Sequence, residues 1–349
     1  MDILNPRSAL AEAVVREASA PALNPGEARL KTDAFALTAN NITYAAFGDM
    51  MKYWDFFPAP EGFARTPVWG FAEVAESQSE AAPVGARVYG YFPMSNELVV
   101  IPGKAAAHGF MDMAAHRQEM ASTYNQYLFK QTDPIYATGS EALQMLFRPL
   151  FTTAFLLDDL IADGDLPDQL ILSSASSKTA FALAALAKAR GVSVVGLTSS
   201  KNVAFVEGLG FYASVHTYDE ADRLSDKPSA YVDFAGNPNI TAGVHNALGD
   251  ALSTSLVVGA TDWEAPKIPQ DMAGPAPQFF FAPDRAAQRA NDWGAAFPEK
   301  LAAAHRAFFK EIDGKITVET LQGAQSIAEA WRSLAAGDVA PDRGLICRL

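Results

Sequence analysis

The densest group of side chains that could bind an anion is a run of small residues at positions 173–177, Ser-Ser-Ala-Ser-Ser. It follows Leu170-Ile171-Leu172, an apolar run typical of a strand that is buried on both faces of a parallel sheet. Residues 178–190 have a helical pattern, and Gly191 is the residue type that commonly ends a helix. Backbone N–H groups at the start of such a helix favour a phosphate. We therefore predict phosphate contacts from Ser174, Ser176, Ser177, Lys178 and Thr179.

A second polar group follows the next strand. Residues 192–197 form an apolar run that ends in Thr198-Ser199-Ser200-Lys201, and the two strands with the helix between them make a βαβ unit. The carboxyl ends of its strands face the same crevice, which predicts a dinucleotide site. An acidic residue at the end of the second strand would repel a 2′-phosphate, whereas Ser199, Ser200 and Lys201 would attract one. The predicted cofactor is therefore NADP, with NADPH favoured over NADH.

The turn at 173–177 contains no glycine, although the dinucleotide fingerprint G-x-G-x-x-G needs three. Serine hydroxyls can donate to phosphate, but serine does not allow the closest approach of the backbone. A βαβ crossover without a nucleotide therefore remains an alternative. Lys178 and Lys201 could also be ordinary exposed lysines at helix ends.

Length and composition narrow the class of protein. The chain has 349 residues, which suggests two domains, with 49% hydrophobic and 19% charged residues as in ordinary globular proteins. A net charge of −13 argues against nucleic-acid and anionic-membrane partners, which need a basic face. The single cysteine, Cys347, excludes a disulfide framework and a cysteine-based zinc site. No signal-peptide or membrane-span pattern is present, so we expect a cytoplasmic protein.

The pattern of elements changes along the chain. Short strands separated by turn residues fill the first part, which indicates a small barrel or sandwich. Residues 111–127 look helical, and a long helical pattern over 140–161 is interrupted by Pro149. Strands then alternate with helices from about 150 to 285, with predicted strands at 230–236, 255–259 and 278–282, and this alternation indicates a doubly wound α/β domain.

This order of parts resembles the medium-chain dehydrogenase/reductase superfamily over nearly the whole chain, and most closely its zinc-free quinone oxidoreductase and enoyl reductase branch. Individually weak motifs occur in that family's order. They are Leu37 to Asn41, Pro67 to Val74, Val84 to Gly90, Phe151 to Ala154, Val206 to Gly210, and Tyr231 to Gly236. The family's Gly-Gly-x-Gly falls on Ser177-Lys178-Thr179-Ala180, and its zinc-binding Gly-His-Glu segment and cysteines have no counterpart. The chain therefore resembles a divergent branch without metal.

The resemblance implies a GroES-like substrate domain, formed by residues 1–130 and completed by 312–349, and a Rossmann-like dinucleotide domain, residues 131–311. It also implies that Thr153 lies beneath the cofactor. In the resembling family the strand corresponding to 278–282 pairs across a two-fold axis, which suggests a homodimer. The alternative is that residues 278–282 form an interior strand covered by helices, without a role in dimer formation.

The resembling reductases transfer hydride to an activated alkene, and the enolate that develops needs a hydrogen-bond or proton donor. Tyr44 and Tyr124 are the candidate catalytic donors. The candidate substrate-binding residues near them are Asn40, Asn41, Asn125 and Tyr127. Tyrosines in such positions are more often satisfied core or interface residues.

Two functions therefore remain open. The first is an NADPH-dependent, zinc-independent reductase of a small enone-, quinone- or carbonyl-type substrate. The second is a non-catalytic cofactor-binding or scaffold protein on the same fold. The glycine-free turn, and the lack of an unmistakable acid or base, favour the second.

Overall fold

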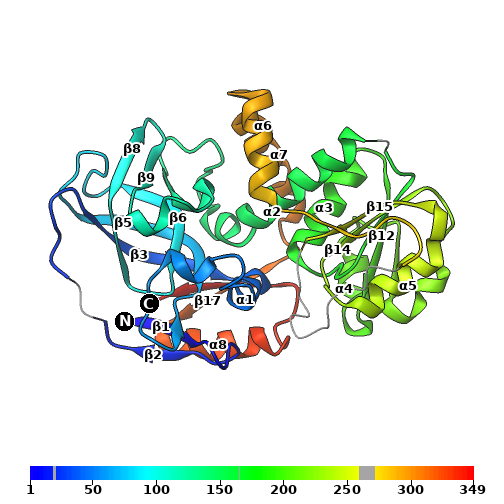
Figure 1. Cartoon of the computed structure of the whole chain (residues 1–349), viewed down its shortest axis with the longest axis horizontal. Helices are drawn as coiled ribbons and strands as arrows, with labels where there is room; N and C mark the ends of the chain where they lie inside the picture. Colours follow the sequence, from blue (N-terminus) through cyan, green and yellow to red (C-terminus); the bar gives the residue numbers. More distant parts are fainter. Residues whose placement is uncertain (19–20, 165, 259–271) are drawn as a thin grey trace. The chain divides into compact units, whose positions relative to one another are not determined.

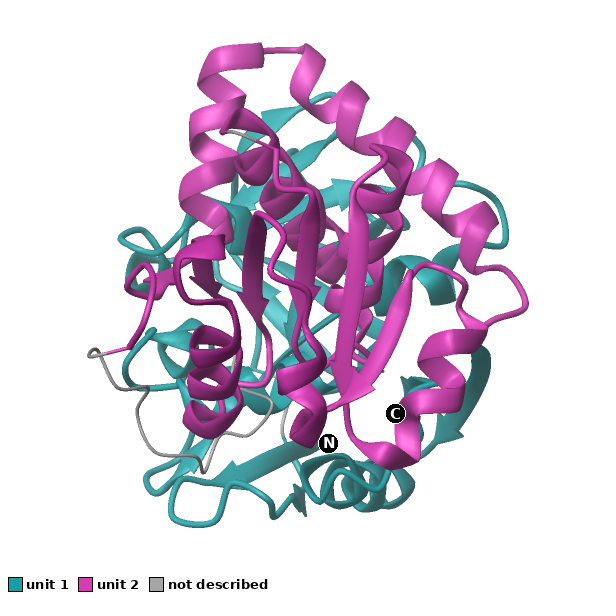
Figure 2. Ribbon diagram, turned by 90° about the vertical axis from the view of Figure 1, so that its right-hand side faces the viewer, with its two compact units in different colours: residues 1–148, 316–349 teal, residues 149–315 magenta. Residues whose placement is uncertain are grey.

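The computed structural model describes residues 1–18, 21–164, 166–258 and 272–349, and Figure 2 colours its two compact units. Unit 1 comprises residues 1–148 and 316–349, and unit 2 comprises residues 149–315. The chain therefore begins unit 1, builds all of unit 2 and then returns to unit 1. The first division, at residue 148, lies inside the long helix α2 (Glu141–Asp163), whereas the resemblance implied a boundary between residues 130 and 131.

Helix α2 runs through Pro149 without interruption, so the predicted break is wrong. An interior proline removes one backbone hydrogen bond and costs about 3 kcal/mol. The side chains on both sides of it, Phe147 and Phe151, are fully buried, and each such burial contributes about 1.5–3 kcal/mol. Packing therefore outweighs the local preference of the proline.

Unit 1 is built on a mostly antiparallel sheet with the order β17-β18-β3-β5-β6-β10-β9-β8, in which β7 also pairs with β3. Strand β3 buries most of its residues, and its second half, 34–37, alternates alanine with larger apolar residues. The strands are β1 (Asp2–Pro6), β2 (Val14–Arg16), β3 (Ala28–Leu37), β4 (Phe63–Ala64), β5 (Pro67–Ser77), β6 (Arg87–Pro93), β7 (Glu97–Val100), β8 (Pro102–Ala106), β9 (Gly109–Asp112), β10 (Gln126–Phe129), β17 (Thr317–Gln322) and β18 (Arg343–Arg348), with helices α1 (Ala39–Ala46) and α8 (Ala324–Ala335).

The C-terminal segment completes this sheet. Strand β18 lies between β17 and β3, and it pairs antiparallel with β3 through Leu345 opposite Leu37 and Cys347 opposite Phe35. Trp331 of α8 is fully buried, and its indole N–H donates to the Leu10 carbonyl at 2.9 Å. The expected fold class, a β-rich domain completed by the end of the chain, is therefore confirmed.

Unit 2 contains a parallel sheet in the order β13-β12-β11-β14-β15-β16. Figure 1 labels three of its strands, β12, β14 and β15. The order is the doubly wound one, in which the direction of winding reverses between β11 and β14. The expected Rossmann-type domain is therefore confirmed. Its elements are β11 (Gln169–Leu172), α3 (Lys178–Ala189), β12 (Ser193–Thr198), α4 (Val203–Gly208), β13 (Ser214–Thr217), β14 (Ser229–Asp233), α5 (Pro238–Leu248), β15 (Leu252–Val257), β16 (Gln278–Phe279), α6 (Ala282–Trp293) and α7 (Ala296–Ile312).

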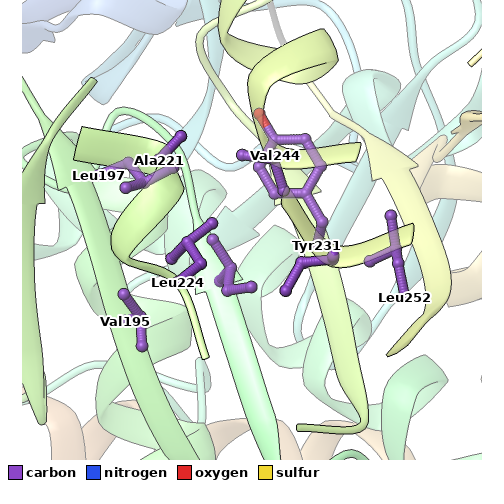
Figure 3. Packing of buried hydrophobic residues seen from close by; sticks show 9 residues of the cluster. Val195, Leu197, Ala221, Leu224, Tyr231, Val244 and Leu252 are labelled. Carbon is purple, nitrogen blue, oxygen red and sulfur yellow. The ribbon is translucent and has the colours of Figure 1, made fainter. Parts of the chain in front are cut away.

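One face of this sheet packs against α5 (Figure 3). Leu197 and Tyr231 of the sheet join Val244 of the helix in a buried apolar cluster. Because side chains alternate along a strand, Thr198 and Gly196 face the opposite side. The strand predicted at 255–259 begins earlier, at Leu252, and the last residue of that prediction lies outside the described residues.

Candidate functional site

The hydroxyl-rich turn at 173–177 joins β11 to α3. Ser177 has extended backbone angles, and its Oγ accepts from the backbone N–H of Ala180 at 3.3 Å. It is therefore the N-cap of α3, the position that serine favours. Lys178 and Thr179 are half-buried in the first turn of the helix, where positive helix-dipole charge accumulates.

Ser174 takes a conformation that is usually left to glycine. Its φ is +48°, in the left-handed region that costs a residue with a side chain about 1–3 kcal/mol. The turn therefore keeps a glycine-like bend without a glycine. Strain of this kind persists only where the surroundings impose it.

A buried carboxylate imposes part of that geometry. Asp233, at the end of β14, accepts from the Ser173 hydroxyl at 2.6 Å and from the Thr241 hydroxyl at 2.9 Å. The backbone N–H groups of Ala235 and Gly236 also donate to it, at 2.9 and 3.1 Å. These bonds join the turn after β11 to the turn after β14, the two strands between which the winding reverses. The sequence did not identify Ser173 and Asp233 as site residues, although Ser173 directly follows the apolar strand β11 and Asp233 ends β14.

Two further side chains hold the turn from its other side. Tyr212 donates its hydroxyl to the Ala175 carbonyl at 2.8 Å, and Asn202 donates its Nδ2 to Ser176 Oγ at 3.0 Å. Gly196 allows this packing, because a Cβ at that position would lie 2.9 Å from both Ala175 and the Tyr212 ring. Neither Asn202 nor Tyr212 was predicted, since both are distant from the turn in sequence.

The end of β12 brings its predicted residues near the same edge of the sheet. Thr198 is 1% exposed, and its Oγ1 has no hydrogen-bond partner among the described residues. Ser199 is half-buried, while Ser200 and Lys201 are exposed in the short turn that precedes α4. A buried hydroxyl without a partner costs about 1–3 kcal/mol, so Thr198 suits a site that receives a polar ligand. Thr153 lies in α2, where its Oγ1 donates to the Pro149 carbonyl at 3.1 Å.

In unit 1 the two predicted donors meet in one aromatic cluster. Tyr44 and Tyr124 are buried together with Tyr53, Phe56, Phe57 and Tyr91. Tyr44 Oη accepts from the indole N–H of Trp69 at 3.1 Å. The ring centroids of Tyr53 lie 4.6 Å from Tyr44 and 6.0 Å from Tyr124. Sequence reasoning therefore chose two members of the cluster and missed those contributed by other segments.

Burial controls the protonation of these phenols. It raises the pKa of Tyr44 and of Tyr124 well above the ordinary value of 10.0. It also raises the pKa of Tyr53, against a hydrogen bond with Tyr124 that lowers it. Each phenol therefore stays protonated at neutral pH, and it can donate a hydrogen bond but cannot act as a base.

The two asparagines predicted beside Tyr44 lie in α1. Asn41 is buried, its Oδ1 accepts from the Thr38 backbone N–H at 2.7 Å, and its Nδ2 donates to the Pro67 carbonyl at 2.9 Å. These bonds form the start of α1 and so orient the helix that carries Tyr44. Asn40 is half-buried in the same first turn.

Asn125 and Tyr127 surround a buried cation, Arg117, which the sequence did not identify. Arg117 Nε donates to Asn125 Oδ1 at 3.0 Å, and its Nη1 donates to the Asp112 carboxylate at 2.8 Å and the Tyr127 hydroxyl at 3.2 Å. Its Nη2 donates to the Tyr124 carbonyl at 2.7 Å. The cation thereby fixes the backbone on which the Tyr124 phenol stands.

The helix predicted over 111–127 is wrong. That segment contains the end of β9, two short 3₁₀ turns at 115–117 and 122–125, and the start of β10. The Arg117 side chain donates to the Tyr124 carbonyl, and Asn125 Nδ2 donates to the Arg117 carbonyl. These side-chain bonds replace the backbone ladder that a helix would need.

Two negative findings apply to the part of the chain that the structure describes. No group of three or more His, Cys, Asp or Glu side chains is arranged to hold a metal ion there. No helix in the same residues combines the length and the apolar character that crossing a membrane would require.

The sequence matches a family model described as protein of unknown function, DUF2855, over residues 35–340. The chain belongs to the DUF2855 family. A comparison with curated proteins finds no match. Membership of the DUF2855 family therefore does not by itself indicate an activity.

Solved structures share its fold across nearly the whole chain. CurA from Vibrio vulnificus, solved with NADPH, is 14% identical, with 96% of this chain and 94% of CurA covered and a TM-score of 0.63. A Bacillus thuringiensis protein assigned as an NADPH:quinone reductase is 13% identical, with coverages of 100% and 98% and a TM-score of 0.62. Etr1p, solved with NADP and crotonyl-CoA, is 14% identical, with coverages of 100% and 99% and a TM-score of 0.61.

At these identities the likeness shows the fold. The resemblance to the quinone oxidoreductase and enoyl reductase branch of the medium-chain superfamily is confirmed at that level. The DUF2855 model is consistent with a divergent branch. The roles of the individual site residues stay predictions.

Proposed function

We propose that the protein is an NADPH-dependent, zinc-independent reductase that delivers hydride to a small enone-, quinone- or carbonyl-type substrate. One observation carries the proposal. The stretch from Ser173 to Asn202 follows β11 and includes the end of β12 in a doubly wound parallel sheet, and it contains hydroxyl groups and lysines but no Asp or Glu. Such sheets bind ligands in the crevice outside the carboxyl ends of their strands.

The residues of unit 2 fit a phosphorylated dinucleotide. The unpartnered Thr198 hydroxyl, the capped start of α3 and the glycine-like bend at Ser174 all suit an anionic ligand. Ser199, Ser200 and Lys201 would hold the 2′-phosphate, and Ser174, Ser176, Ser177, Lys178 and Thr179 the diphosphate. The dinucleotide supplies the hydride when it is bound. Solved proteins of the same fold with NADPH or NADP support the choice of cofactor.

Lys201 offers the sharpest test of the cofactor. Lys201→Glu should reduce the preference for NADPH over NADH at least tenfold, because a charge-assisted contact is worth about 1.5–3 kcal/mol and the new carboxylate repels the 2′-phosphate. Lys227→Glu is the matched control, since Lys227 is exposed and precedes β14 at the opposite edge of the sheet. Calorimetric titration measures both affinities. A preference that survives Lys201→Glu would remove the assignment of this 2′-phosphate site.

For the chemistry, we propose that Tyr44 and Tyr124 donate to the oxygen on which negative charge develops during reduction. Neutral phenols held in an apolar cluster are effective donors, because little solvent competes for them. Among the described residues, the members of this cluster are aromatic or apolar and include no carboxylate that would oppose such charge, and the rings suit a planar substrate. Asn40, Asn41, Asn125 and Tyr127 would line or orient this site.

NADPH oxidation across a panel of enones, quinones and aldehydes tests this chemistry. Tyr44→Phe or Tyr124→Phe should reduce kcat about 10²-fold or more, the usual loss for one donor to a developing oxyanion. Unchanged NADPH affinity in both variants would show that the loss is chemical. Binding of NADPH without turnover of any substrate would favour the non-catalytic alternative.

The proposal includes a homodimer and a cytoplasmic location. Strand β16 is the outermost strand of its sheet, and Phe279 within it is 62% exposed. An exposed edge strand can pair with its copy across a two-fold axis. Sedimentation of the wild type and of Phe279→Lys should give a dimer and a monomer, respectively. The cytoplasmic location depends on the single cysteine.

A further inference from the structure

Two of the four serine hydroxyls of the turn, those of Ser176 and Ser177, share one feature. Ser176 Oγ accepts from Asn202 Nδ2, and Ser177 Oγ accepts from the Ala180 backbone N–H. A hydroxyl has one hydrogen and two lone pairs. Once an N–H fills a lone pair, the hydroxyl hydrogen is left for another acceptor. Within the described residues neither of these two hydroxyls donates to a protein atom.

Asn202 connects two turns that are distant in sequence. It ends the 3₁₀ turn 200–202 that leads into α4, and its side chain makes no capping bond to that helix. The side chain instead reaches the turn that precedes a different helix, α3, and donates to Ser176. The bond therefore joins the turn after β11 to the turn after β12.

We propose that Asn202 is a positioning residue of the nucleotide site. By donating to Ser176 it keeps that hydroxyl as a donor toward the crevice, where the diphosphate of a dinucleotide accepts it. This inference rests on the proposed dinucleotide binding. A glycine-rich turn offers backbone N–H groups at close range, and the serine-rich turn offers hydroxyl hydrogens whose direction is set by a neighbour.

Three neighbours support the donor arrangement. Asp233 binds Ser173 and Tyr212 binds the Ala175 carbonyl, so the residues before Ser176 are fixed from two sides. Ser177 is fixed by its cap. Among the described residues, Asn202 is the one partner of the Ser176 side chain. A single substitution of Asn202 should therefore change the direction of the Ser176 hydroxyl and leave the rest of the turn in place.

The inference makes a prediction that separates Asn202 from Lys201. The diphosphate is common to NADPH, NADH and ADP-ribose, so Asn202→Ala should weaken all three by a similar factor, about five- to tenfold, as expected for one neutral hydrogen bond. Ser176→Ala should have a similar effect. The double variant should lose no more affinity for the ligands than the single variant that loses more, because the two residues act as one unit. Asn202→Asp should weaken binding further, since a carboxylate accepts the Ser176 hydrogen and repels phosphate.

Calorimetric titration with the three ligands and hydrogen exchange without ligand test the inference together. Exchange at residues 174–179 should become faster in Asn202→Ala, which reports positioning independently of binding. Asn246→Ala, an exposed position on α5, is the matched control and should change neither reading. Unchanged or tighter binding in Asn202→Ala overturns the inference, and so does a loss confined to NADPH.

The same experiment separates this inference from the proposed function. Binding of the ligands without turnover would remove the reductase and keep the positioning role. A wild type that binds none of the three ligands overturns both. Additive losses in the double variant would show that Asn202 and Ser176 contact the ligand separately, which also overturns the positioning role.

Discussion

Each candidate region is organised around one buried charge, and the two charges have opposite signs and different partners. In unit 1, Arg117 is paired with the Asp112 carboxylate and three neutral groups. In unit 2, Asp233 accepts hydrogen bonds from two hydroxyls and two backbone N–H groups. The first region is an ion pair inside an aromatic cluster, and the second is a carboxylate held by dipoles. Loss of Arg117 should therefore destabilise unit 1 because a buried carboxylate loses its counter-charge. Loss of Asp233 should destabilise unit 2 because buried hydrogen-bond donors lose their acceptor.

The largest effect is expected at Arg117. Arg117→Met should lower the free energy of unfolding by about 3–5 kcal/mol, because Asp112 would keep a buried charge without its partner. Chemical denaturation followed by tryptophan fluorescence measures the change. Arg117→Met combined with Asp112→Asn should recover part of the loss. A loss below about 1 kcal/mol for the single variant would contradict the role of the ion pair.

A smaller loss is expected at Asp233. Asp233→Ala leaves the Ser173 and Thr241 hydroxyls and two backbone N–H groups without their acceptor, which should cost about 2–4 kcal/mol. The loss should be local to unit 2, so hydrogen exchange should rise in β11 and β14. Asp233→Asn keeps one acceptor oxygen and should fall between the wild type and Asp233→Ala. An equal rise in hydrogen exchange in both units would contradict the expectation that the loss is local to unit 2.

The aromatic cluster should make unit 1 sensitive to alkali. Burial raises the pKa of Tyr53, Tyr91 and Tyr124 above the ordinary value of 10.0, so the folded protein keeps protons that the unfolded chain releases. Stability from these groups is complete below pH 10 and falls as the pH rises above it, by up to about 1.4 kcal/mol per pH unit for each phenol. Urea denaturation between pH 9 and about pH 11 measures the slope. Tyr91→Phe should reduce it by about one phenol, and an unchanged slope would contradict this.

The smallest effect is expected at Ser174. Ser174→Val should be less stable than Ser174→Gly by about 1–2 kcal/mol, because a β-branched side chain tolerates a φ of +48° poorly and glycine adopts it freely. Thermal unfolding of the two variants measures the difference. Equal stabilities would show that the turn relaxes to a negative φ when residue 174 changes. This result would weaken the view that the turn is fixed by its neighbours.

The sequence predicted the features that depend on short-range patterns. The apolar run before Ser173 and the helical pattern after Ser177 indicated β11 and α3, and Gly191 indicated the end of that helix. Strand–helix alternation indicated the doubly wound sheet. The serine turn and the residues at the end of β12 were found because they directly follow predicted strands.

The missed residues act across long separations. Asn202 reaches Ser176, Tyr212 reaches Ala175, and Asp233 reaches Ser173, and no local pattern reveals such pairs. The helical pattern around Arg117 was misleading for the same reason, since the Arg117 guanidinium and the Asn125 amide donate to backbone carbonyls that a helix would otherwise bond. Propensity is a local quantity, and these bonds depend on tertiary structure.

The position of β18 affects how the protein is made in the cell. Leu37 in β3 pairs with Leu345 in β18. This edge of β3 therefore stays without its partner strand until the ribosome has added the residues between them. At about 5–20 residues per second this takes roughly 15–60 s, and unit 2 is complete in sequence before unit 1 is. An unpaired strand edge is a template for wrong association. The nascent chain should therefore need protection by chaperones at its first-made part rather than at its middle.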